Sequence, residues 1–443
     1  MPSEPKLENP PLSGEEAPRV QRDPTRDTLD KNRDSLSAGL IQPRSEASLI
    51  RTWINNIHLY RFPLALAVVA VHSGEFVATL SRTNSVSSHS FGLWAVEFLT
   101  MLSRLATPSF LLIAGLVFCK DGTASQAQYF RKIKSRCHSL LVPYLAWNFL
   151  AVLLLCAPLA INFFYSPEST ADAPVTLGRL AKWMMGWPIY PADAPLWFVR
   201  DLLLLIAIVP LLNFIPPRVQ ILGLAALFIY WLSSPMDLIP GGMPRAFSVL
   251  FFMMGVAIGM NQVLLSAMAK AEWLIYTAGA ILLFSAAAGA TCTILGTDYS
   301  GLRTLLERMV RVSGALLVVG AGARSRFPNW LSDQLNRLSP AAFFLFASHY
   351  LVFLCLAKLF AKFTQNLFRP GYEVLLFGLV FSIVIAISLA SYFLMRRYTP
   401  SLLGMLDGNR STRAAVNPLN RQLELETPLA PPLPVTARSH SAT

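Results

Sequence analysis

Long apolar segments fill most of the chain after its first 50 residues, and they constrain its fold more than any other feature. Hydrophobic residues make up 54% of the 443 residues, and charged residues only 14%. An ordinary globular domain carries about 25% charged residues, so this composition excludes a soluble protein. A stretch of about 20 apolar residues is long enough to cross a bilayer as a helix. The sequence therefore predicts an all-α polytopic integral membrane protein.

Ten segments are predicted to be transmembrane helices. They cover residues 57–78, 92–118, 139–161, 196–214, 219–234, 245–262, 273–295, 305–322, 341–361 and 373–395. Several are at or below the length that a spanning helix needs, so the boundaries are approximate and the count is about ten. The polar stretches 1–50 and 399–443 are predicted to be disordered cytoplasmic tails. The membrane domain is expected over residues 51–398.

Lysine and arginine collect in every second connection between these segments. The basic residues are Lys120, Arg131, Lys132, Lys134, Arg136, Arg218, Lys270, Arg324, Arg326, Arg337, Arg396 and Arg397. Positive residues favour the cytoplasmic side, so both termini are predicted to be cytoplasmic. The longest loop, about 162–195, is then outside the cytoplasm. Its tryptophans and tyrosines either belong to a functional loop or only anchor the protein at the interface.

The chain is basic, with a formal net charge of +12 at pH 7. Its basic residues lie beside apolar segments and not in one patch. Lipid headgroups and topology account for them, and no nucleic-acid partner is expected. The five cysteines are Cys119, Cys137, Cys156, Cys292 and Cys355. No pair of them has metal-ligand or redox spacing, and no metal site is predicted.

The first apolar segment carries an arginine and a histidine, Arg61 and His72, eleven residues apart. This spacing is close to three helical turns, so both side chains share one face and are separated by roughly 16 Å along the axis. Ionisable groups inside a membrane are costly and often mark a functional path. The alternatives are that Arg61 extends to the interface and that His72 bonds a backbone carbonyl.

Four further polar residues in the predicted spans are candidate substrate-binding residues. Glu97 and Arg104 lie seven residues apart, on nearly the same face of the second segment. Arg104 needs a partner or a cavity, so it serves either binding or a structural ion pair. Trp197 lies near the outer end of the fourth segment, where an interfacial role is the alternative. His349 lies in the ninth segment, where a structural role is the alternative.

These residues occur in motifs that resemble a known family, the bacterial membrane acyltransferases called acyltransferase family 3. Arg61, ten residues and His72 reproduce the first motif of that family. The further matching segments are RLATPSFLLIAGLVF (104–118), FRKIKSRCHSLLVPYLAW (130–147), PLWFVRDLLLL (195–205), FFMMGVAIG (251–259) and FFLFASHYLVF (343–353). The resemblance covers about residues 52–398. It implies ten membrane helices, acyl-coenzyme A as the donor substrate, and a hydroxyl group of a surface or secreted glycan or glycolipid as the acceptor.

A sugar hydroxyl group is a weak nucleophile at neutral pH, so its attack on a thioester calls for a base. Histidine in apolar surroundings tends to be neutral, which makes His72 the candidate base, with Arg61 as the second catalytic candidate. Lys132, Lys134 and Arg136 are predicted to bind the phosphates of coenzyme A, unless this cluster is only a topology signal. No permanently bound cofactor is expected.

Several alternatives stay open. Arg104 either polarises the thioester carbonyl or holds the acceptor, and His72 acts either directly or through an acyl-enzyme. A transporter or flippase of a glycan or lipid would also place charges inside its spans. An acyltransferase for a lipid or small molecule is a third possibility. Acetyl is the expected acyl group by analogy with the family, with succinyl as the alternative. The bacterial inner membrane is the expected location, with membrane lipid as a partner.

Overall fold

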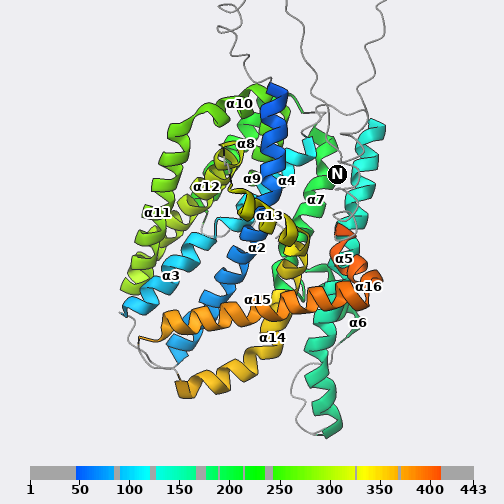
Figure 1. The fold of residues 1–443 in the computed structure, drawn as a ribbon, viewed down its shortest axis with the longest axis vertical. Helices are drawn as coiled ribbons and strands as arrows, with labels where there is room; N and C mark the ends of the chain where they lie inside the picture. Colours follow the sequence, from blue (N-terminus) through cyan, green and yellow to red (C-terminus); the bar gives the residue numbers. More distant parts are fainter. Residues whose placement is uncertain are drawn as a thin grey trace, which may run out of the picture. The chain divides into compact units, whose positions relative to one another are not determined.

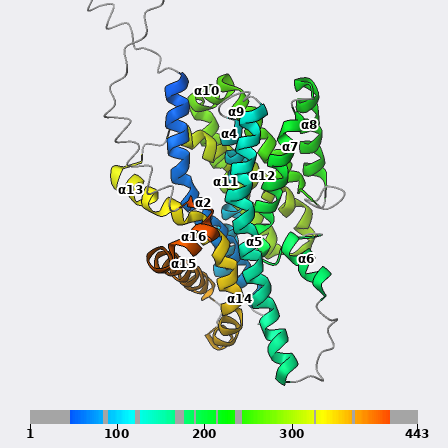
Figure 2. The same ribbon diagram turned by 90° about the vertical axis from the view of Figure 1, so that its right-hand side faces the viewer.

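The computed structural model describes residues 46–83, 90–119, 126–165, 176–187, 190–212, 215–234, 243–324, 327–367 and 371–410. The chain divides into two compact units, Met1–Ser48 and Leu49–Thr443. Figures 1 and 2 show its helices from two directions. The parts of the predicted tails at residues 1–45 and 411–443 lie outside the described residues.

Helices account for nearly all of the described residues, and no β-strand occurs among them. The α-helices are α2 (Glu46–Thr83), α3 (Phe91–Ser103), α4 (Ala106–Cys119), α5 (Gln126–Tyr165), α6 (Leu177–Met185), α7 (Trp197–Leu212), α8 (Pro217–Ser233), α9 (Ala246–Met260), α10 (Gln262–Lys270), α11 (Glu272–Leu295), α12 (Ser300–Arg324), α13 (Asn329–Leu338), α14 (Ala342–Leu367), α15 (Glu373–Tyr398) and α16 (Pro400–Asp407). Short 3-10 helices are η2 (Ala194–Leu196), η3 (Thr297–Tyr299) and η4 (Ser339–Ala341). The prediction of an all-α protein is confirmed.

The described residues of each predicted segment are mainly helical, but fewer segments qualify as membrane spans. Among the described residues, six helical stretches are long and apolar enough to cross a membrane: Asn56–Ser81, Phe91–Phe118, Ile133–Leu155, Glu272–Leu295, Asn329–Leu356 and Glu373–Tyr398. The apolar helices at Arg218–Ser233 and Ala246–Met260 are shorter, and α12 carries several charges. A multi-pass membrane protein is therefore supported, whereas the count of about ten spans stays a prediction.

Two boundaries differ from those expected. The predicted span 92–118 is not one continuous helix, because α3 ends at Ser103 and α4 begins at Ala106. The amide of Arg104 donates to the carbonyl of Met101 at 3.1 Å, a tighter turn than that of an α-helix. The helical part also continues past residue 398, since α16 packs on α5 and buries Leu403 and Leu406. Residues 400–407 therefore do not belong to a disordered tail.

The helix α15 packs on α14 and crosses its first part (Figures 1 and 2). Its first residue, Glu373, is buried and accepts a hydrogen bond from the Ser90 hydroxyl group at 2.8 Å. Ala70 and Val77 of α2 pack with Val96 of α3 and with α15 in one apolar cluster. Contacts between residues far apart in the sequence thus hold α2 beside α3.

Helices α4 and α9 pack closely together, and this packing depends on glycine. A Cβ atom added at Gly115 would lie 2.1 Å from the carbonyl oxygen of Phe252, and one at Gly255 would lie 2.1 Å from that of Leu112. Small residues at such contacts let two backbones approach within a membrane. Any larger residue must push the two helices apart.

We therefore expect Gly255→Ala to destabilise the protein by about 1–3 kcal/mol, the usual cost of overpacking. The measurement is the thermal unfolding midpoint of the purified protein in detergent. Gly378→Ala in α15 is the matched control, because nothing lies within 4 Å of the added methyl group there. Equal midpoints for the two variants would contradict the close packing of α4 and α9.

Candidate active site

The helix α2 places a histidine and a glutamate on one face, three residues apart. The Nδ1 atom of His72 lies 3.1 Å from Oε2 of Glu75. An ionised carboxylate has only acceptors, so Nδ1 carries the proton and donates it. The Nε2 atom of a neutral His72 then has a free lone pair. The two side chains are partly exposed, at 29% and 46%, so a reactant can reach them.

Glu75 begins a series of alternating charges that joins three parts of the chain. Its Oε1 atom lies 3.3 Å from Nη2 of Arg104, at the break between α3 and α4. Nη1 of Arg104 in turn donates to Oε1 of Glu307 on α12 at 3.1 Å. Glu307 also pairs with Arg311 and lies 3.9 Å from Nη1 of Arg303. Each carboxylate thus compensates arginines on a neighbouring helix, which charges in apolar surroundings require.

A second histidine lies against the first. The ring centroids of His72 and His349 are 5.3 Å apart, and that of Tyr350 is 6.3 Å from His72. His349 is fully buried and its Nδ1 atom donates to the carbonyl of Phe346 at 2.6 Å. Among the described residues, its Nε2 atom has no partner. The α14 helix therefore brings a neutral acceptor nitrogen to the side of His72.

Of the other residues expected in the site, some lie near it and some do not. Arg104 pairs with Glu75 and Glu307, and Glu97 is buried on α3. Trp197 packs edge-on against Phe247, with ring centroids 5.5 Å apart. The guanidinium of Arg311 lies 4.8 Å from the centroid of the same Phe247 ring. Phe247 therefore lies between Trp197 and the charged series.

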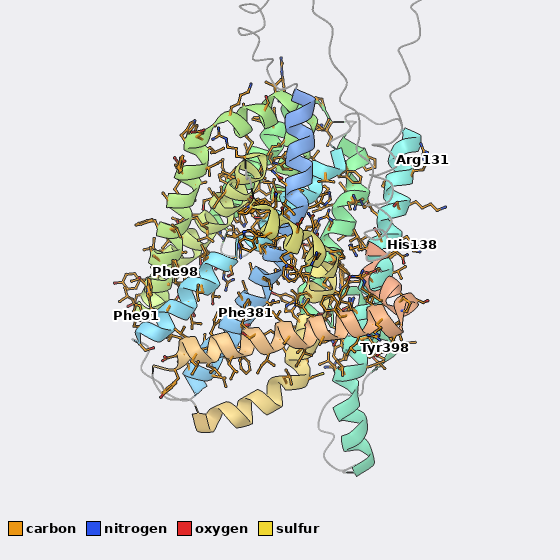
Figure 3. All side chains as sticks on the ribbon, viewed as in Figure 1. Phe91, Phe98, Arg131, His138, Phe381 and Tyr398 are labelled. Carbon is orange, nitrogen blue, oxygen red and sulfur yellow. The ribbon has the colours of Figure 1, made fainter. Side chains whose placement is uncertain are left out.

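The basic residues expected to bind coenzyme A are separated from His72. Arg61 lies on the continuous helix α2 with His72, about three turns away, and it interacts electrostatically with Arg136 of α5. Lys134 and Arg136 are exposed, and the side chain of Lys132 lies outside the described residues. Figure 3 shows Arg131 of the same helix extending away from the other helices. Arg61 and this part of α5 thus form one basic region.

Sequence reasoning assigned no role to three carboxylates in or near this centre, which are Glu75, Glu307 and Asp193. Glu75 follows His72 by three residues, a helical spacing that would have revealed it. Asp193, which precedes η2, is fully buried, and neither of its oxygen atoms has a partner among the described residues. It interacts electrostatically with Tyr144 and Tyr350. Burial raises the pKa of the Asp193 carboxyl group well above its usual range.

No group of His, Cys, Asp and Glu in the described part of the chain is arranged to hold a metal ion. The centre instead combines two imidazoles, a carboxylate that orients one of them, and a row of arginines. This set can accept a proton from a hydroxyl group beside fixed positive charge, the requirement for attack on an activated carbonyl.

Comparison with known proteins points to the same chemistry. A family described as the acyltransferase domain matches residues 54–394 of the chain. The chain is also similar to the succinoglycan biosynthesis protein ExoH of Rhizobium meliloti (strain 1021). The two are 27% identical over 331 residues, which cover 72% of this chain and 83% of the relative. No solved structure matches the chain.

The charged series yields a prediction about stability. Glu307→Gln leaves Arg104 and Arg311 without their shared carboxylate. Breaking a fully buried pair typically costs about 3–5 kcal/mol, and this is the upper limit here because the three side chains are 13% to 21% exposed. The thermal unfolding midpoint in detergent should therefore fall strongly. Glu272→Gln is the matched control, because Glu272 pairs with Arg324 at 2.7 Å but its side chain is 65% exposed. A Glu307→Gln midpoint no lower than that of the control would contradict the compensating role of Glu307.

The buried carboxyl group of Asp193 yields a prediction about pH. Its pKa is raised in the folded protein, so above about pH 4 the unfolded chain releases a proton that the folded protein keeps. This contribution to stability falls as pH rises, by at most about 1.4 kcal/mol per pH unit. Asp193→Asn lacks this pH-dependent contribution, so its stability relative to that of the unaltered protein should rise as the pH rises above about 4. If the free energies of unfolding of the two proteins change in parallel with pH, the raised pKa of the Asp193 carboxyl group is contradicted.

Proposed function

Because the chain belongs to the acyltransferase domain family and is a multi-pass membrane protein, we propose that it transfers an acyl group from acyl-coenzyme A to a hydroxyl group of a cell-surface or secreted polysaccharide or glycolipid. The relative is a succinoglycan biosynthesis protein, which supports a polysaccharide acceptor. Acetyl is the proposed acyl group, with succinyl as the alternative. The proposed location is the bacterial inner membrane, with both termini in the cytoplasm.

The observation that carries this proposal is the hydrogen bond of His72 to Glu75. Glu75 fixes the ring so that Nε2 is the basic atom, and it stabilises the imidazolium that forms when the proton arrives. Nε2 takes the proton of the acceptor hydroxyl group as its oxygen attacks the thioester carbonyl. The carbon–sulfur bond then breaks, and the proton passes from His72 to the leaving sulfur. An ester and free coenzyme A result.

The neighbours of His72 and Glu75 have separate proposed roles. Arg104 holds Glu75 in place, since both its Nη atoms bond carboxylates, so we assign it as a positioning residue. The free Nε2 atom of His349 accepts a hydrogen bond from the acceptor. Glu97, which is buried on α3, stays a proposed substrate-binding residue.

The donor enters from the basic region formed by Arg61 and α5. Arg61 and Arg136 provide forked donors for phosphate oxygens, and Lys134 adds a point charge. Arg61 is therefore proposed to bind the donor and not to touch the reacting atoms. The distance of about 16 Å along α2 is covered by the long pantetheine arm, which carries the thioester away from the phosphates and toward His72.

His72→Ala should lower acyl transfer by about 10²–10⁴-fold, the usual contribution of a general base. The measurement is mass spectrometry of surface and secreted glycans from cells with the intact gene, a deletion, and the variant. An ester-sized mass should appear only with the intact gene. Its mass identifies the acyl group.

His138→Ala is the matched control, because this histidine is exposed on α5, away from the centre (Figure 3). It should leave the ester mass unchanged. Unchanged acylation in the His72→Ala cells, at an equal amount of protein in the membrane, would reject the assignment of the base. Unchanged acylation in the deletion would reject the proposed function.

A further inference from the structure

A second cationic site lies at the start of α9, away from the histidine pair. Arg245 is the N-cap residue of this helix. Its guanidinium lies over two aromatic rings, 3.9 Å from the centroid of Trp197 and 4.8 Å from that of Tyr190. Contact with two ring faces restricts the plane of the guanidinium and leaves only its edges for hydrogen bonds.

One edge of this guanidinium has no partner. The Nε and Nη2 atoms of Arg245 are both buried and bond nothing in the described part of the chain. The backbone amide of Arg245 donates to Asp201, but both oxygen atoms of that carboxylate already accept other hydrogen bonds. Oδ2 of Asp201 accepts from the Arg245 amide at 3.0 Å and from the Ser248 hydroxyl group at 2.9 Å, and Oδ1 accepts from Arg200 at 2.9 Å.

The two unpartnered atoms, Nε and Nη2 of Arg245, suit a carboxylate as their ligand. The N–H bonds of Nε and Nη2 point in the same direction from one side of the guanidinium, at the spacing of the two oxygen atoms of a carboxylate. A buried donor that bonds nothing is costly, and a charged one is more so. A carboxylate bound at this edge would satisfy both donors at once.

A series of side-chain contacts links this edge to the site of the proposed reaction. Trp197 packs on Phe247, and Phe247 lies under Arg311, which pairs with Glu307. Glu307 bonds Arg104, which holds Glu75. Arg245 also follows a connection that is predicted to be outside the cytoplasm, and Tyr190 belongs to the long outer loop. That side is where a surface or secreted acceptor would arrive.

We propose that Arg245 binds a carboxylate group of the acceptor glycan, so that the substrate of this enzyme is an acidic polysaccharide. The proposal rests on the proposed function and adds the class of acceptor. Arg245 and the indole of Trp197 hold the acidic sugar, while a hydroxyl group of the same glycan reaches His72. Trp197 therefore acts by fixing Arg245 in addition to contacting the sugar.

The test uses the purified full-length protein in lipid nanodiscs. The probe is a set of fragments of the extracellular polysaccharide of the host cells, either intact or with carboxylates converted to primary carboxamides. Carboxamides keep the shape of the group and remove its charge. The unaltered protein should bind the intact fragments about tenfold or more tightly than the carboxamides, as expected for loss of a charged bidentate contact.

Arg245→Lys keeps the positive charge and removes the fork. It should weaken binding of the intact fragments about tenfold and leave binding of the carboxamides unchanged. Arg179→Lys is the matched control, since Arg179 also lies over a tryptophan, Trp183, at 5.1 Å, but is exposed. Arg179→Lys should change the binding of neither the intact fragments nor the carboxamides. The comparison of intact and amidated fragments uses the unaltered protein, so it decides the question even if a variant folds poorly.

Equal binding of the intact and amidated fragments overturns the carboxylate site. Binding that is lost on removal of phosphate groups, and not on amidation, overturns it as well. Acyl transfer is measured on the same fragments to separate the two proposals. Equal transfer to both forms keeps the proposed function and rejects the site. Arg245-dependent binding without any transfer keeps the site and rejects the proposed function.

Discussion

Charges inside apolar helices must be compensated by opposite charges on neighbouring helices, and the centre of this protein is organised by that requirement. Arg104 would be costly in the second apolar segment if it stood alone. It stands instead between Glu75 of α2 and Glu307 of α12, and Glu307 also compensates Arg311. The three parts of the chain are therefore held together by a series in which positive and negative groups alternate. The break between α3 and α4 occurs at Arg104 itself.

The same series orients His72, the residue that we propose as the base. Glu75 bonds Arg104 with one oxygen atom and His72 with the other, so the arginine holds the carboxylate in place and the carboxylate holds the ring. A base that is already oriented loses less entropy when the reactants meet. His349 packs against this ring from α14 without any charge of its own to compensate. The centre thus combines a rigid ionic framework on one side with a neutral, buried face on the other.

Much of this arrangement was predictable from the sequence. The apolar segments indicated the helices, and the high cost of charge in such segments singled out His72 and Arg104. Their partners were not predictable, because Glu307 is 203 positions from Arg104 and only the tertiary structure brings the two together. Glu75 was within reach of sequence reasoning, three residues after His72. Arg245 and Asp193 were not, since an unpartnered buried group has no signature in a single sequence.

The central claim is that the centre around His72 moves an acyl group and not a whole glycan. The most direct measurement uses vesicles that contain the purified protein, with isotope-labelled acetyl-coenzyme A on one side and the polysaccharide fragments on the other. The account predicts that label appears as an ester on the fragments while coenzyme A is released in equal amount. Fragments that cross the membrane unmodified, with the donor left intact, would contradict it.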